Sequence, residues 1–151
     1  MTKPSINRKS RFKQGIYKPI HPEKYIGESE ITYRSGWEKR MCFWLDTNDS
    51  VLLWNSESAI VPYISPIDNK IHKYYVDFLA KMRLKDGSEK TYAIEIKPKS
   101  QCLPSKARNK QRLITETATY LVNQAKWKFA KEHFEKQGVQ FIVINEDDMG
   151  I

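Results

Sequence analysis

Two carboxylates and a lysine that together could cleave a phosphodiester lie in one predicted β-hairpin, which spans residues 71–99. Apolar residues alternate along residues 76–84 and again along 92–96, so each stretch reads as a strand with one buried face. Asp77, Glu95 and Lys97 fall on the opposite face, in the middle of the strands, where apolar or neutral residues are usual.

The turn of this hairpin sets which residues face each other. A three-residue loop, Lys85-Asp86-Gly87, with Gly87 in the left-handed conformation, pairs the strands so that Asp77 lies directly across from Glu95. Their Cβ atoms would then be about 5 Å apart. A two-residue Asp86-Gly87 turn would instead place Asp77 opposite Ile96 and bring the apolar faces out of register. We expect the three-residue loop.

Two carboxylates this close repel each other unless a proton or a cation lies between them. Oxygen ligands suit Mg²⁺, which takes one or two protein carboxylates and keeps several waters. A metal bound there can polarise a phosphodiester and lower the pKa of its water, and Lys97 would hold the attacking water or offset developing charge. The alternative is a surface ladder in which Lys97 merely screens two solvated acids.

Composition limits the class of protein. The 151 residues are enough for one domain with a core, and 40% hydrophobic and 29% charged residues are usual for a soluble chain. No stretch predicts a membrane span or a signal peptide, so we expect a cytoplasm-like compartment. Two cysteines and three scattered histidines give neither a disulfide framework nor zinc spacing. The net charge of +8 favours a polyanionic partner.

The positive charge is concentrated in two runs without acids. Residues 1–18 read as a flexible basic arm that could lie along phosphates, or as a solvated tail. The second run follows the second strand of the hairpin, so we expect its charge to fall beside the carboxylates, where a phosphate backbone must lie. A later pair, Asn123 and Lys126, flanks Trp127 and either meets DNA or forms a solvated helix face. The candidate DNA-binding residues are Arg8, Lys9, Arg11, Lys99, Lys106, Arg108, Lys110, Arg112 and Lys126.

A further acid, Glu38, lies in a short amphipathic helix predicted over residues 35–45. Ser35 and Glu38 have the spacing of a capping box, which explains Glu38 structurally. The same residue shares a face with Met41, Cys42 and Leu45 and so points towards the core, where a lone carboxylate is unfavourable. Glu38 is therefore either a helix cap or a further ligand or water-positioning base.

The remaining elements frame this hairpin. Residues 51–54 and 59–63 read as short strands, the second at an edge because of Pro62. Helical spacing is weak over 106–122 and strong over 123–137, and Gly138 follows the helix end. Residues 139–144, VQFIVI, read as an interior strand.

Four motifs together resemble the PD-(D/E)XK nuclease superfamily, and more closely its TnsA-like endonuclease branch: SGWEKR, YYVDFLA, YAIEIKPK and NQAKWKFAKEHFEKQGVQFIVINE. The resemblance covers about residues 35–144 and implies an α/β, restriction-endonuclease-like core with a central mixed β-sheet flanked by helices on both faces. It implies that Asp77 and Glu95 hold Mg²⁺, or Mn²⁺ in its place, with the backbone carbonyl of Ile96. It also implies that Lys97 serves the attacking water and that Glu38 completes the site. Val76 stands where the family name has proline.

The basic N-terminus and residues 20–40 are also similar to those of phage head completion nucleases. That similarity implies a role in virion assembly on packaged DNA ends, with double-stranded or branched DNA and phage head, portal or neck proteins as partners, as a monomer or a homo-oligomer. The protein would then be found in the host cytoplasm or in the virion. We divide the chain into a basic arm and loop, 1–28, and a nuclease domain, 29–151. Alternatives are a transposon-end or repair and junction endonuclease, a non-catalytic DNA-binding head-completion protein, and, less favoured, an RNA-acting protein.

Overall fold

The computed structural model describes residues 14–27 and 30–150. At its centre is a four-stranded mixed sheet in the order β3-β6-β7-β8. β7 pairs antiparallel with β6 and parallel with β8. The strands are β3 (Val51–Ser56), β6 (Phe78–Arg83), β7 (Glu89–Ile96) and β8 (Gln140–Ile144).

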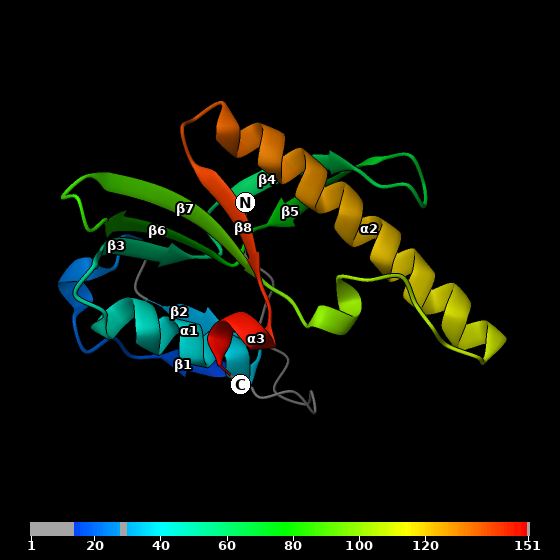
Figure 1. Cartoon of the computed structure of the whole chain (residues 1–151), viewed down its shortest axis with the longest axis horizontal. Helices are drawn as coiled ribbons and strands as arrows, with labels where there is room; N and C mark the ends of the chain where they lie inside the picture. Colours follow the sequence, from blue (N-terminus) through cyan, green and yellow to red (C-terminus); the bar gives the residue numbers. More distant parts are fainter. Residues whose placement is uncertain (1–13, 28–29, 151) are drawn as a thin grey trace.

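Helices cover both faces of this sheet (Figure 1). On one face lies α1 (Gly36–Thr47), which begins at the N-cap Ser35 and buries Met41, Cys42 and Leu45 against the sheet. On the other lies α2 (Lys110–Glu135), whose Ala130 and Phe134 are buried. The predicted α/β architecture with a mixed sheet between helices is confirmed.

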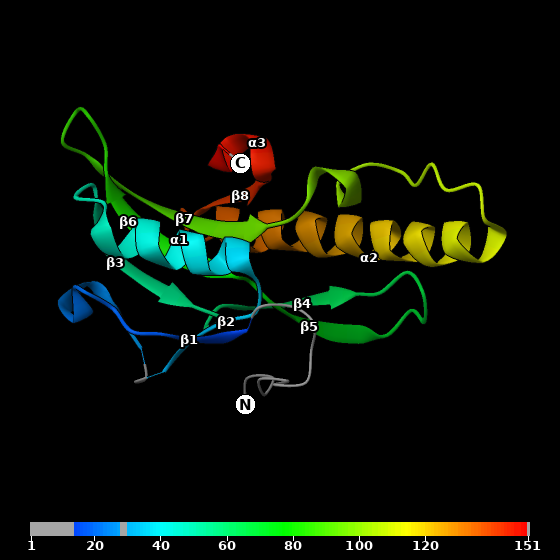
Figure 2. The same cartoon turned by 90° about the horizontal axis from the view of Figure 1, so that it is seen from below.

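Two small ribbons flank the main sheet. β1 (Gly15–Tyr17) pairs with β2 (Ile31–Tyr33), and β4 (Ile60–Ile64) pairs with β5 (Ile71–Tyr75), as Figure 2 shows from below. Short helical turns are η1 (Pro22–Lys24), η2 (Lys99–Gln101) and α3 (Glu146–Met149). In the described part of the chain, no helix combines the length and apolar character needed to cross a bilayer.

Part of the predicted N-terminal arm is folded. The Tyr17 and Tyr25 rings pack edge-on against buried Trp54, at centroid distances of 6.3 and 4.8 Å. Arg8, Lys9 and Arg11 lie outside the described residues. The domain boundary at residue 28 stays a prediction.

The register of the hairpin is the expected one. Phe78 pairs with Ile94 and Arg83 with Glu89. Gly87 has φ of +87° in a three-residue loop. The first strand, however, is not continuous: it breaks between β5 and β6, and Val76 packs in the core on the α2 side rather than beside Phe78. The break arises because the chain crosses there from the β4–β5 ribbon to the main sheet.

Two other predictions need correction. Helix α2 is one continuous helix of 26 residues that begins at the N-cap Asn109, rather than a weak segment followed by a strong one. Its threonines fit because Thr115 and Thr119 donate hydroxyl hydrogen bonds to the carbonyls four residues earlier. Within the described residues β8 is an edge strand, not an interior one. The apolar run of β8 arises because both faces of this strand are covered by hydrophobic side chains. Ile142 and Ile144 pack against the cluster on the α1 side of the sheet, and Phe141 packs against the cluster on the α2 side.

Candidate active site

Asp77 and Glu95 meet where the chain enters β6 and leaves β7. Glu95 is 6% exposed, and the backbone N–H of Ile96 donates to Asp77 Oδ2 at 2.8 Å. Lys97 Nζ lies 3.6 Å from Glu95 Oε1. The structure therefore brings the three predicted side chains together, with Glu95 buried rather than solvated as the surface-ladder alternative requires.

Two more side chains complete this cluster from the α2 side. The hydroxyl of buried Tyr74 donates to Glu95 Oε2 at 2.6 Å. Lys126 Nζ lies 5.5 Å from the centre of the Tyr74 ring and 5.8 Å from that of Tyr63. Lys126 is thus a partly buried cation beside the carboxylates and not part of a solvated helix face.

Burial and mutual repulsion dominate the electrostatics of the carboxylates. Burial, then the charges of Glu95 and Glu38, hold the pKa of Asp77 well above its ordinary value. Burial also raises the pKa of Glu95, although Lys97, the Tyr74 hydrogen bond and Lys126 oppose the rise. The site therefore concentrates negative charge that a bound cation would stabilise.

Glu38 caps α1, and its role as a ligand or water-positioning base stays a prediction. Its backbone N–H donates to Ser35 Oγ at 3.1 Å, and its carboxylate accepts from that hydroxyl at 3.2 Å and from the backbone N–H of Arg34 at 3.4 Å. The helix cap is present, with the reciprocal backbone bond made by Arg34 rather than by Ser35. Burial and the charges of Glu57 and Glu95 raise the pKa of Glu38.

Glu57 is a residue that the sequence did not single out. It is 6% exposed and has φ of +53°, and its Oε1 pairs with Arg34 Nε at 2.6 Å. Its backbone N–H donates to the carbonyl of Asp77 at 3.0 Å, so this loop fixes the chain at the strand break. An acid just after a strand is an ordinary loop residue in sequence, and nothing local marks it.

The donor set fits a hard divalent ion. Among the described residues no group of three or more His, Cys, Asp or Glu side chains is arranged as metal ligands. The neighbouring acids Asp77 and Glu95 match Mg²⁺, which typically binds one or two carboxylates and otherwise water. The Ile96 carbonyl and Glu38 as additional ligands stay predictions.

The second basic run does not gather at the carboxylates as expected. Lys99 Nζ pairs with Asp147 at 3.0 Å, and its backbone N–H donates to Glu146. Arg112 pairs with Glu116 at 2.8 Å. Lys106 and Arg108 are exposed in the segment before α2, and the exposed Lys110 is its first residue. The end of α2 that begins there projects beyond the sheet in Figures 1 and 2. The contact of these residues with DNA stays a prediction.

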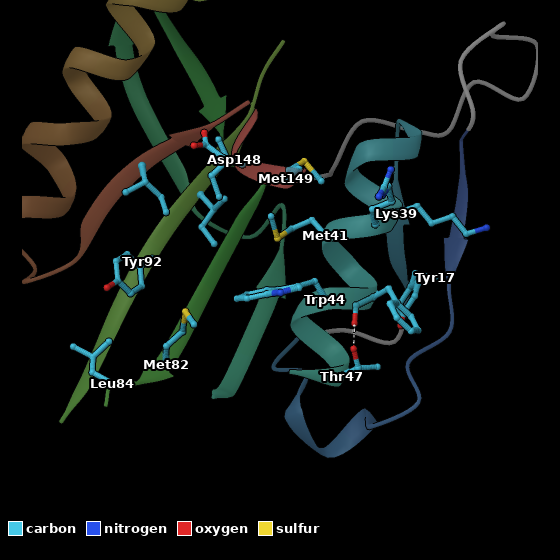
Figure 3. Close-up of a pocket in the computed structure, with 15 residues that line it drawn as sticks. Tyr17, Lys39, Met41, Trp44, Thr47, Met82, Leu84, Tyr92, Asp148 and Met149 are labelled. Atoms are coloured by element: carbon cyan, nitrogen blue, oxygen red, sulfur yellow. Dashed lines mark hydrogen bonds between the residues drawn. The ribbon is translucent and has the colours of Figure 1, made fainter. Parts of the chain in front are cut away.

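A cavity of about 690 Å³ lies between α1 and the central sheet. Figure 3 shows Met41 and Trp44 of α1 facing Met82 and Tyr92 of the sheet across it. None of the carboxylates described above lines this cavity, which is mostly apolar. The carboxylate cluster and this cavity are therefore separate sites.

Comparison with known proteins agrees with the fold. Residues 48–146 match the family described as TnsA-like endonuclease N terminal, so the chain belongs to the TnsA-like endonucleases. It is also 37% identical over 142 residues to the "Head completion nuclease" of Enterobacteria phage T4, covering 89% of this chain and 92% of that protein. The predicted family and the resemblance to a head completion nuclease are confirmed.

Proposed function

We propose that this protein is a metal-dependent DNA endonuclease that acts on packaged DNA ends during phage head completion. One observation carries the activity: Asp77, which accepts from the backbone N–H of Ile96, lies close to Glu95, and Lys97 Nζ lies 3.6 Å from Glu95 Oε1. The endonuclease family and the name of the phage T4 relative support the substrate and the role.

In this proposal Asp77 and Glu95 hold Mg²⁺, which Mn²⁺ can replace. When bound, the ion supplies charge stabilisation and a water of lowered pKa. Lys97 orients the attacking water and offsets charge on the phosphate, because its ammonium is next to Glu95 and partly exposed. Tyr74 fixes one oxygen of Glu95. Glu38 holds the first turn of α1 against the site and is placed to accept a hydrogen bond from water.

The partners follow from the same proposal. The protein would bind double-stranded or branched DNA and act beside phage head, portal or neck proteins, in the host cytoplasm or in the virion. Cutting both strands of a duplex would be easiest for a homodimer or for a subunit docked on a larger ring.

The test is cleavage of linear, nicked and branched DNA by wild type and Glu95→Ala, each with Mg²⁺ and with EDTA. The matched control is Glu89→Ala, since Glu89 lies on the same strand, is exposed and pairs with Lys81 at 3.0 Å. We expect Mg²⁺-dependent cutting by wild type and the control, and loss of at least about 100-fold in Glu95→Ala. Equal cutting by Glu95→Ala refutes the site. Salt-sensitive binding without cutting by wild type would favour a structural head-completion protein.

A further inference from the structure

A polar cavity of about 370 Å³ lies next to the carboxylate cluster, between α2 and the segment that follows β7. It is lined by Lys97, Gln101, Thr119, Asn123 and Lys126, with two small apolar residues, and none of these lining residues is acidic. Lys97 belongs to both the cavity and the carboxylate cluster. A group held in the cavity is therefore a close neighbour of the reacting phosphate.

Asn123 is the unusual member of this cavity. It is 5% exposed, and its amide nitrogen Nδ2 is buried without a hydrogen-bond partner. Leaving a buried donor unsatisfied is unfavourable, so a native structure seldom keeps one without a reason. Because Asn123 lines the cavity, a rotation of its side chain would present that donor to a ligand in the cavity.

The chemistry of the donors selects an oxyanion. The two lysine ammonium groups and the free amide nitrogen of Asn123 can donate hydrogen bonds and cannot accept them. Phosphate oxygens are strong acceptors, and charge-assisted bonds to them are among the stronger ones. A carboxylate could use the same donors, but the proposed substrate of the adjoining cluster carries phosphates.

We infer that this cavity is a phosphate subsite. In it Lys126 and Asn123 hold a second phosphate of the strand that is cut, and this phosphate is not the one at which cleavage occurs. The inference rests on the proposed function for its ligand. The phosphate is either an internal one beside the cut or a 5′-terminal one. In both cases the subsite sets where along the strand the reacting phosphate comes to rest.

The first experiment measures binding of a short DNA duplex in EDTA, so that no cleavage is needed. Lys126→Gln is compared with Lys128→Gln, since Lys128 is an exposed lysine two residues along the same helix. We expect Lys126→Gln to weaken binding about 10-fold and Lys128→Gln less than about 2-fold. Equal effects of the two changes would overturn the inference.

Asn123→Leu separates ligand binding from structure. Leucine has a similar size and removes the unpaired donor, so the melting temperature should stay the same or rise while DNA binding weakens about 10-fold. A lower melting temperature with unchanged binding would show that Asn123 is structural and would overturn its role. If Asn123→Leu does not fold, the lysine pair still decides the case.

The position of the phosphate is found by replacing single phosphates with neutral methylphosphonates. We expect one replacement to weaken binding by wild type about 10-fold and to have little further effect on Lys126→Gln. If removal of a 5′-phosphate reproduces this pattern, the terminal phosphate is the ligand. The same penalty at every position in both proteins would refute the subsite. Binding that depends on Asn123 and Lys126 without any cleavage would refute only the nuclease proposal.

Discussion

Replacing Asp77 by asparagine should stabilise the metal-free protein while abolishing cleavage. At a separation of about 5 Å, the usual spacing of cross-strand neighbours, two carboxylates repel by about 3 kcal/mol at an effective dielectric constant of about 20. Lys97 offsets part of this repulsion. The asparagine oxygen can still accept from the N–H of Ile96, although a neutral acceptor is weaker by about 1 kcal/mol. The expected net gain is about 1–2 kcal/mol.

The gain should depend on pH with a definite sign. The pKa of Asp77 in the folded chain is raised above its ordinary value of 3.8. The stability linked to this group is therefore fully present below pH 3.8 and is lost as the pH rises through the raised pKa. Asp77→Asn should match wild type in acid and exceed it at higher pH. Asp77→Asn should still lose some stability as the pH rises, because Glu38 and Glu95 also have raised pKa values.

The assay is thermal unfolding in EDTA across a pH series, then with millimolar Mg²⁺. A gain of 1–2 kcal/mol corresponds to about 2–8 °C for a domain of this size. Asp86→Asn is the control on the same hairpin: hydrogen bonds from Ser88 lower the pKa of Asp86, so this change should give no gain. Mg²⁺ should stabilise wild type and the control but not Asp77→Asn. An Asp77→Asn protein less stable than wild type at every pH would refute the reasoning.

Two further predictions follow from buried hydrogen bonds. Tyr74→Phe removes the 2.6 Å hydrogen bond to Glu95 and should lower the free energy of unfolding by about 1–2 kcal/mol. Because that bond lowers the pKa of Glu95, the change should also move the acid limb of the pH–kcat/KM profile to higher pH. An acid limb that does not move would exclude Glu95 as the titrating group. Asp46 is fully buried and accepts hydrogen bonds from the Tyr17 hydroxyl at 2.6 Å and from the backbone N–H of Ile20 at 2.7 Å. Although burial opposes them, these bonds lower the pKa of Asp46 below 3.8. Asp46→Asn should therefore lower the free energy of unfolding by about 2 kcal/mol at neutral pH. Because that stability is lost as the pH falls through the lowered pKa, the gap in urea unfolding should close in strong acid, and a gap that is constant with pH would contradict the assignment.

The proximity of Asp77 and Glu95 was predictable because local rules fix the register of the hairpin. A glycine able to adopt positive φ at residue 87 and the two-residue period of strands leave one register for the hairpin, and that register is observed. The mixed sheet between helices followed from the order of the elements and from the family resemblance. The helix cap of α1 followed from the Ser35–Glu38 spacing.

What the sequence could not give depends on tertiary crossings. Val76 changes face because the strand breaks at the crossing between two sheets, and alternation within one strand cannot reveal this. Glu57 reaches the site through a loop of positive φ, and Lys126 reaches it because α2 packs on the β4–β5 ribbon, where its ammonium lies over the Tyr63 and Tyr74 rings. The ion pair of Lys99 with Asp147 of α3 could not be predicted either, because charge counted along the chain ignores acids that only the fold brings close.

The unbroken length of α2 has a consequence for the size of the substrate. From Lys110 at its exposed end to Lys126 beside the carboxylates the helix rises about 24 Å, at about 1.5 Å per residue. Duplex DNA advances about 3.4 Å per base pair, so this distance spans about seven base pairs. A rigid helix would then set a minimum length of duplex. If the duplex lies along α2, DNA that extends less than about seven base pairs from the cut towards Lys110 would not contact the basic end of the helix.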